Sequence, residues 1–121
     1  MANEAQTVRD WAQKPANREN ARVWAAALRS GEYLQGRGQL CHQRLDGVCT
    51  WCCLGVGADV LYEGDWQHDA GLWGIGSSYG VLDETIRAQL HLTFEVTGAL
   101  IYLNDTAKWG FVEIADLLDP P

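Results

Sequence analysis

The chain has 121 residues, a net charge of −7, 47% hydrophobic residues and six tryptophans. This length and composition predict one domain with its own apolar core and argue against disorder. The sequence has no apolar run near the ~20 residues that a membrane span needs and no signal-peptide pattern, so we expect a cytoplasmic protein with reduced cysteines and no membrane partner.

Charge is distributed unevenly along the chain. Residues 1–44 carry seven Arg/Lys and four Asp/Glu, whereas residues 45–121 carry two and twelve. This asymmetry predicts a bipolar surface. Binding to nucleic-acid phosphates requires concentrated positive charge, so we expect no sequence-specific DNA binding. The basic N-terminal third, residues 1–44, is still able to bind a small anion.

The first third predicts two helices. Asn3 and Gln6 resemble a capping box before a helix over residues 4–14. Asn17 is the expected cap of a second helix that ends at Ser30-Gly31. We interpret residues 1–16 as an N-terminal helical extension and residues 17–121 as the core of a single domain.

Three arginines share one stripe of the second helix. Arg22 and Arg29 lie four and eleven residues after Arg18, and these offsets nearly complete whole turns. A solvated polar face and an anion-binding face both fit this pattern.

The middle of the chain predicts strands. Gly36 and Gly38 flank Arg37, which is typical of an irregular edge that enters a strand. Residues 40–43 and 48–51 are expected to pair as a hairpin around the Asp46-Gly47 turn.

The next predicted element is a helix over residues 51–62, capped by Thr50. Gly55 and Gly57 weaken this helix locally and indicate the close approach of another backbone. A glycine-rich loop over residues 63–80 follows, with a short second hairpin around residues 72–75.

The remaining sequence predicts three helices. Asp83 is the expected cap of a helix through Leu90, and apolar spacing indicates helices over residues 94–103 and 109–118. The predicted fold class is therefore α+β, with about five helices and one or two short antiparallel β-hairpins.

The cysteines allow several interpretations. Cys49 and Cys52 form a C-x-x-C, with Cys53 adjacent and Cys41-His42 on the partner strand of the hairpin. A structural zinc site, a redox pair, a nucleophile at Cys52 or Cys53, and buried packing thiols are all compatible with this arrangement, and packing thiols are favoured.

An acidic-loop hydrolase is a further alternative. Its candidate residues lie close together in the glycine-rich loop: Glu63, Asp65, His68 and Asp69. No coherent catalytic set emerges, so we assign no catalytic residue, no metal ligand and no cofactor.

Three blocks carry a family resemblance. They are Trp24–Gly31 with Gln35–Leu40, Cys52–Val56, and Leu103–Asp105 with Phe111–Leu118. Together they resemble a group of small bacteriophage and prophage accessory proteins, over most of the chain from about residue 20 onward. Cys41 and Cys49 are not part of the shared pattern, and Gly57-Ala58-Asp59 lacks a third cysteine that members commonly have, which weakens the zinc interpretation.

The resemblance implies a small phage protein that acts on the host. We expect a non-enzymatic antagonist of bacterial antiphage immunity, located in the host cytoplasm, that binds either an immune protein or a small anionic nucleotide signal. A small enzyme acting on a nucleotide and a zinc-stabilised interaction protein are the alternatives. A homodimer is possible through a free strand edge near Gly36.

The expected nucleotide site combines cations, amides and aromatic rings. Arginines would hold the phosphates and tryptophan faces would stack on the bases. The predicted ligand-binding residues are Arg22, Arg29, Gln35, Arg37, Gln39, Trp66 and Trp73.

Overall fold

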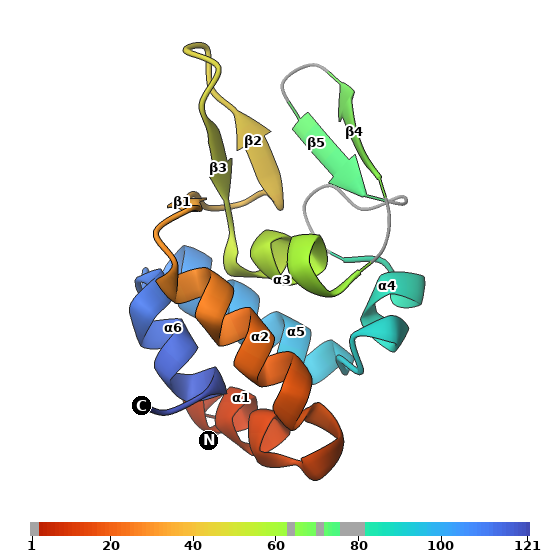
Figure 1. The fold of residues 1–121 in the computed structure, drawn as a ribbon, viewed down its shortest axis with the longest axis vertical. Coiled ribbons are helices and arrows are strands. Elements are labelled where there is room, and N and C mark those ends of the chain that lie inside the picture. The colour runs from red at the N-terminus through yellow and green to blue at the C-terminus, as the bar shows by residue number, and fades with distance from the viewer. Residues whose placement is uncertain (1–2, 63–64, 70–71, 76–81) are drawn as a thin grey trace.

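The computed structural model describes residues 3–62, 65–69, 72–75 and 82–121 (Figure 1). Within these residues the fold is α+β, as predicted, with six α-helices, a 3-10 turn, a π-helical turn and five short strands. The helical elements are α1 (Glu4–Gln13), η1 (Pro15–Asn17), α2 (Arg18–Arg29), α3 (Cys53–Leu61), α4 (Glu84–Gln89), α5 (Phe94–Ile101), η2 (Tyr102–Thr106) and α6 (Phe111–Leu118). The strands are β1 (Leu34–Gln35), β2 (Cys41–Gln43), β3 (Cys49–Trp51), β4 (Trp66–Asp69) and β5 (Leu72–Ile75). None of the described helices is long and apolar enough to span a bilayer.

The two predicted hairpins join into one mixed sheet. The strand order is β1-β3-β2-β5-β4, in which β2 pairs antiparallel with both β3 and β5. β1 pairs parallel with β3, which the sequence did not predict. The sheet occupies one end of the molecule, with α3 between it and helices α1, α2, α5 and α6 (Figure 1).

Most helix starts follow local rules. The side chains of Asn3 and Asp83 accept hydrogen bonds from backbone N–H groups at 3.0 and 2.9 Å, as predicted. Asn17 occupies the N-cap position of α2, as predicted, but its side chain does not cap the helix, because its amide is buried and donates to the carbonyl oxygen of Trp11 at 2.9 Å.

The start of α3 was also predicted wrongly. Thr50 belongs to β3, where it pairs with His42, and the helix begins at Cys53. The Sγ of Cys52 accepts the N–H of Gly55 at 3.4 Å and replaces the expected hydroxyl cap. Strand pairing therefore extends further into this segment than its helical pattern indicated.

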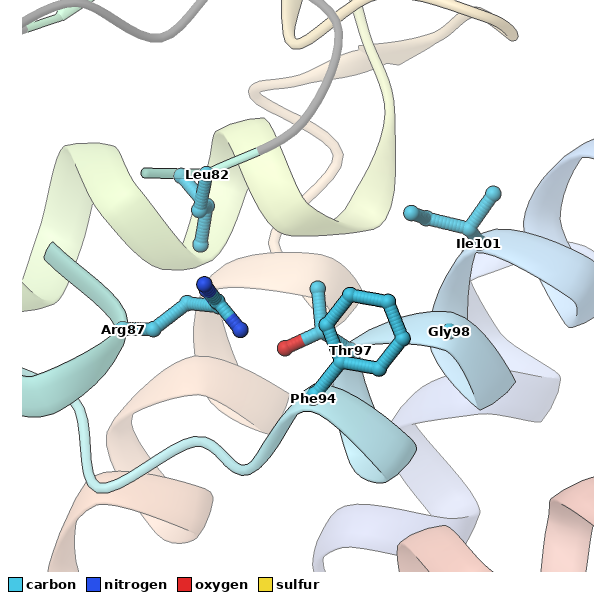
Figure 2. A pocket seen from close by; sticks show the side chains of 6 residues that line it. All are labelled: Leu82, Arg87, Phe94, Thr97, Gly98 and Ile101. Carbon is cyan, nitrogen blue, oxygen red and sulfur yellow. The ribbon is translucent and has the colours of Figure 1, made fainter. Parts of the chain in front are cut away.

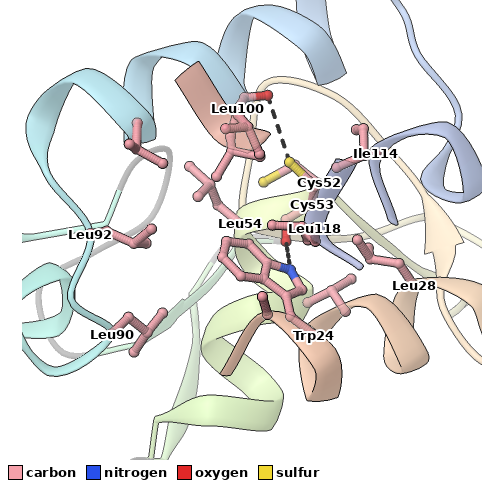
Figure 3. Close-up of a cluster of buried hydrophobic side chains, with 14 of the residues drawn as sticks. Trp24, Leu28, Cys52, Cys53, Leu54, Leu90, Leu92, Leu100, Ile114 and Leu118 are labelled. Atoms are coloured by element: carbon pink, nitrogen blue, oxygen red, sulfur yellow. Dashed lines mark hydrogen bonds between the residues drawn. The ribbon is translucent and has the colours of Figure 1, made fainter. Parts of the chain in front are cut away.

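The core lies where the helices meet under α3. Trp24, Leu54, Leu100, Ile114 and Leu118 are fully buried there (Figure 3). The indole of Trp24 donates to the carbonyl oxygen of Cys53 at 3.0 Å, so this large side chain is satisfied as well as buried (Figure 3).

Helix α1 is part of this core. Its Val8, Trp11 and Ala12 are buried, and the helix packs against α5 and α6. The indole of Trp11 donates to the carbonyl oxygen of His91 at 2.8 Å. The segment interpreted as an extension is thus packed against the C-terminal half of the chain.

The two glycines of α3 allow close packing, as predicted. A Cβ on Gly55 would lie 1.9 Å from the carbonyl oxygen of Leu40, so this position brings helix and sheet backbones together. A Cβ on Gly57 would lie 2.6 Å from the ring of Trp24, so there the close neighbour is a side chain.

Candidate ligand-binding site

The predicted ligand-binding residues lie in three separate places. Arg22 and Arg29 are on α2, Gln35, Arg37 and Gln39 lie around β1 and before β2, and Trp66 and Trp73 are on β4 and β5. Since β1 and β4 are opposite edges of the sheet, the structure does not bring all of them together.

The arginines of α2 are engaged by carboxylates. Arg29 donates to the carboxylate of Asp116 at 2.8 Å and to the carbonyl oxygen of Asp119 at 2.6 Å. Arg18 donates to the carboxylate of Asp119 at 2.7 Å. Arg22 pairs with exposed Glu19, which raises the pKa of the arginine and lowers that of the glutamate through their hydrogen bond. The stripe thus pairs mainly with the C-terminal end of α6.

Gln35 and Arg37 share the partner Asn104. Gln35 donates to the side-chain oxygen of Asn104 at 2.9 Å, and Arg37 Nε donates to its backbone carbonyl at 3.0 Å. Gln39 lies half-buried just before β2. The two polar residues of β1 and its following loop therefore fasten this edge of the sheet to η2.

Asn104 satisfies its complete hydrogen-bonding capacity. Its Oδ1 accepts from Gln35 and from the backbone N–H of Cys53, and its Nδ2 donates to the carbonyl oxygen of Gly36 and to the carboxylate of Asp105. The side chain is fully buried within η2, a π-helical turn. It therefore joins β1, the start of α3 and the C-terminal helices.

Trp66 and Trp73 share a hollow with Trp51. The hollow has a volume of about 200 Å³ and is lined by Cys41, Cys49 and the three tryptophans. Strand pairing explains the cluster, because Cys41 is opposite both Trp51 and Trp73 on neighbouring strands. Side chains from four strands thus meet on one face of the sheet.

The wall of this hollow is held in place by edge-to-face contacts. The ring of Trp51 lies 5.2 Å from Tyr33 and 5.3 Å from Trp66, nearly perpendicular to both. Asp59 of α3 accepts hydrogen bonds from the Tyr33 hydroxyl and from the indole N–H of Trp66, the latter at 3.0 Å. Burial, followed by this bond to Asp59, raises the pKa of Tyr33. The aromatic wall is therefore pre-organised.

The indole nitrogen of Trp73 has no hydrogen-bond partner among the described residues. Among the side chains that the structure describes, Trp73 Nε1 is one of two buried nitrogens without a hydrogen bond. An unsatisfied buried donor costs about 1–3 kcal/mol. Because this nitrogen is buried, an acceptor in the hollow would reach it, and remove that cost, only after the indole or its neighbours move.

The same sheet face continues past Trp73 into a polar region. His68 is opposite Trp73 and its ring lies 4.8 Å away. Beyond it, His68 lines a shallow depression with Gln43, Arg44 and Leu45. Arg44 pairs with Asp46 at 2.7 Å, and both side chains are about half exposed, with relative areas of 49% and 50%. Such a surface pair is weak and can exchange for another anion.

Cys41, Cys52 and Cys53 are protonated at neutral pH. Burial, together with the neighbouring Cys49, raises the pKa of Cys41 to about 12. Burial also raises the pKa of Cys52 to about 11 and that of Cys53 well above its ordinary value. Cys53 donates weakly to the carbonyl oxygen of Leu100 at 3.6 Å (Figure 3). Because the thiolate is the nucleophilic form, this environment disfavours a cysteine nucleophile at Cys52 or Cys53.

The other sequence alternatives have less geometric support. Within residues 3–62, 65–69, 72–75 and 82–121, no three His, Cys, Asp or Glu side chains form a group suited to a metal ion. Of the acidic-loop residues, Asp65 precedes β4, His68 contacts Trp73, and Glu63 lies outside the described residues.

Sequence reasoning missed the contribution of Trp51, Cys41 and Cys49 to the hollow. Alternation along the hairpin places Cys41 on the same sheet face as Trp51 and Cys49, and this was a usable signal. The pairing of β2 with β5 is a contact between distant segments, and no local pattern indicates it.

Comparison with known proteins places the chain in a family. It belongs to a family described as a domain of unknown function (DUF8296), whose sequence model matches residues 16–88. The matched region contains α2, the whole sheet and α3. No curated protein and no solved structure matches the chain.

Proposed function

We propose that this protein is a non-enzymatic binding protein whose tryptophan hollow accepts the base of a nucleotide-type ligand. The observation that carries the proposal is the hollow itself, in which three indoles surround a space of about 200 Å³ and Trp73 Nε1 has no partner among the described side chains. Stacking of a base on an aromatic side chain contributes about 1–3 kcal/mol and tolerates different bases.

The N–H of Trp73, which has no partner among the described residues, supports a base over a purely apolar ligand if the indole reorients on binding, because its nitrogen is buried in the free protein. Carbonyl oxygens and ring nitrogens of a base are acceptors, and one of them would satisfy this donor. The thiols of Cys41 and Cys49 line the same space. Since burial keeps Cys41 uncharged, it contributes a weak donor and no negative charge.

The phosphate of such a ligand would lie toward His68 and Arg44. The contact between the rings of His68 and Trp73 places the polar depression next to the hollow. Arg44 has only a half-exposed partner in Asp46, whereas Arg29 is held by Asp116 and Asp119. This assignment replaces Arg22 and Arg29 with Arg44 as the phosphate ligand.

The biological context comes from the resemblance to phage accessory proteins. A small phage protein that binds a nucleotide without turnover would sequester a signal of bacterial antiphage immunity in the host cytoplasm. The protonated thiols of Cys52 and Cys53 favour binding over cysteine catalysis.

Calorimetry with a panel of cyclic and linear nucleotides tests the proposal. We expect one member to bind, and Trp73→Phe, which keeps an aromatic ring but removes the N–H, to weaken binding by roughly 5–30-fold. Arg44→Gln should also weaken it, whereas the matched control Arg22→Gln should leave affinity unchanged. No binding by any nucleotide would refute the ligand class, and loss of binding in the control alone would refute the phosphate position.

A further inference from the structure

A second hollow lies between α4 and α5, remote in the sequence from the tryptophan hollow. It has a volume of about 170 Å³ and is lined by Leu82, Arg87, Phe94, Thr97, Gly98 and Ile101. Figure 2 shows the guanidinium of Arg87 extending from α4 into this space, toward Thr97 and Phe94.

The walls of this hollow are mainly apolar and remain accessible. Phe94, Gly98 and Ile101 recur along one side of α5, and Phe94 is 81% exposed. A Cβ placed on Gly98 would have no neighbour within 4 Å, so the space above the helix is open. Thr97 adds little polarity, since its hydroxyl donates to the carbonyl oxygen of Thr93 at 2.8 Å.

Arg87 supplies an unsatisfied donor at the end of this hollow. Its Nε is buried and has no hydrogen-bond partner among the described residues. Its Cζ lies 5.6 Å from the centre of the Phe94 ring, a cation–π distance, and this contact leaves the N–H without an acceptor. An acceptor that displaces the atoms covering Nε would therefore complete this site.

We propose that this hollow binds a carboxylate carried on a short apolar group. Nε and one Nη of a guanidinium form a fork that matches the two oxygens of a carboxylate. Leu82, Phe94 and Ile101 would contact the apolar group. A phosphate dianion fits less well, because the site offers one cation and the same two helices carry Glu84 and Glu95.

Such a carboxylate has two possible sources. It belongs either to a free short-chain acid or to the C-terminus of a partner chain that ends in an apolar residue. Both sources present the same chemistry to Arg87, and the volume of the hollow suits a group of this size.

Titration of the full-length protein with four probes tests the assignment. The probes are hexanoate, hexanol, a short peptide that ends in leucine with a free carboxyl terminus, and the same peptide amidated. We expect the free acids to bind at least ~10-fold more tightly than their uncharged counterparts, because a charge-assisted hydrogen bond is lost in the latter. Binding of hexanoate would identify a free acid as sufficient, and binding of the peptide alone would identify a chain terminus.

Variants separate this site from a structural role and from the tryptophan hollow. Arg87→Gln should abolish the preference for the acid, whereas Arg9→Gln, a change on exposed α1 surface, should preserve it. Because Phe94 is highly exposed, Phe94→Ala should fold normally and weaken both hexanoate and hexanol. Trp73→Phe should leave hexanoate binding unchanged. Equal affinity for acid and alcohol, full affinity in Arg87→Gln, or no binding of either acid would overturn the proposal.

Discussion

Replacement of Asn104 by aspartate removes two hydrogen-bond donors from a fully buried side chain that makes four hydrogen bonds. The two shapes are nearly identical, so the test changes chemistry rather than packing. The aspartate still accepts from Gln35 and from the N–H of Cys53, at the positions now 2.9 and 3.2 Å away. Its second oxygen, however, faces the carbonyl of Gly36 and the carboxylate of Asp105, at the present donor distances of 2.9 and 2.8 Å.

The expected loss of unfolding free energy follows from these four contacts. Two bonds become repulsions, and a buried donor or acceptor left unsatisfied costs about 1–3 kcal/mol. An ionised carboxylate in a fully buried position adds a further penalty, so we expect a loss of about 3–5 kcal/mol of unfolding free energy at pH 7. Urea denaturation followed by tryptophan fluorescence measures this quantity directly.

The pH dependence gives this prediction a second readout. Burial and Asp105 should raise the pKa of the introduced carboxyl above its unfolded value of about 3.9. A raised folded pKa means that the variant is least destabilised below about pH 4 and loses stability as the pH rises through the folded pKa. In the double variant with Asp105→Asn, part of the loss should be recovered. An N104D protein within about 1 kcal/mol of wild type at pH 7, or one that gains stability with rising pH, would refute this reasoning.

Three further predictions concern packing, ion pairs and thiols. Gly55→Ala should lower the unfolding free energy by at least about 3 kcal/mol in urea denaturation, because its Cβ would meet a backbone carbonyl. The control Gly98→Ala should be neutral or stabilising by up to about 1 kcal/mol, because its Cβ would meet open space. Equal effects of the two substitutions would contradict the close approach of α3 to the sheet. Arg29→Met should lower the melting temperature by a few degrees, as expected for a partly exposed charge network that contributes about 1 kcal/mol. Arg22→Met should leave the melting temperature unchanged. A larger effect of Arg22→Met than of Arg29→Met would show that the arginines of α2 are not anchored to α6. Burial raises the pKa of Cys52 from about 9 to about 11, so the stability that its protonated thiol contributes is complete below pH 9 and is lost as the pH rises toward 11. Cys52→Ser, which keeps a helix cap, should therefore lose less stability over this pH range in urea denaturation. An identical slope of stability against pH in both proteins would contradict a buried thiol.

Much of the fold was predictable because it follows from local rules. Asn3 and Asp83 begin helices through their own side chains, and the Asp46-Gly47 turn sets the first hairpin, with Gly47 at a φ of +85°. The close approach at Gly55 was also indicated correctly, since glycine within a helical pattern signals a nearby group.

The remaining features depend on contacts between distant segments. The parallel pairing of β1 with β3 and the pairing of β2 with β5 turn two hairpins into one sheet, and no turn residue specifies either. The partners of Arg29 lie 87 and 90 residues away, so its role at the end of α6 is invisible to helix periodicity. The prediction that Arg22 and Arg29 bind a ligand therefore remains a prediction, and the geometry favours Arg44.

The most direct test of the central claim observes the indole N–H of Trp73 during nucleotide titration. In ¹H–¹⁵N correlation spectra, the resonance of this unpartnered donor should shift and gain protection from hydrogen exchange as the ligand binds. The indole of Trp24, which already donates to Cys53, should remain unchanged and serves as the internal control. Saturable nucleotide binding with an unmoved Trp73 resonance would contradict the claim that the base occupies the tryptophan hollow.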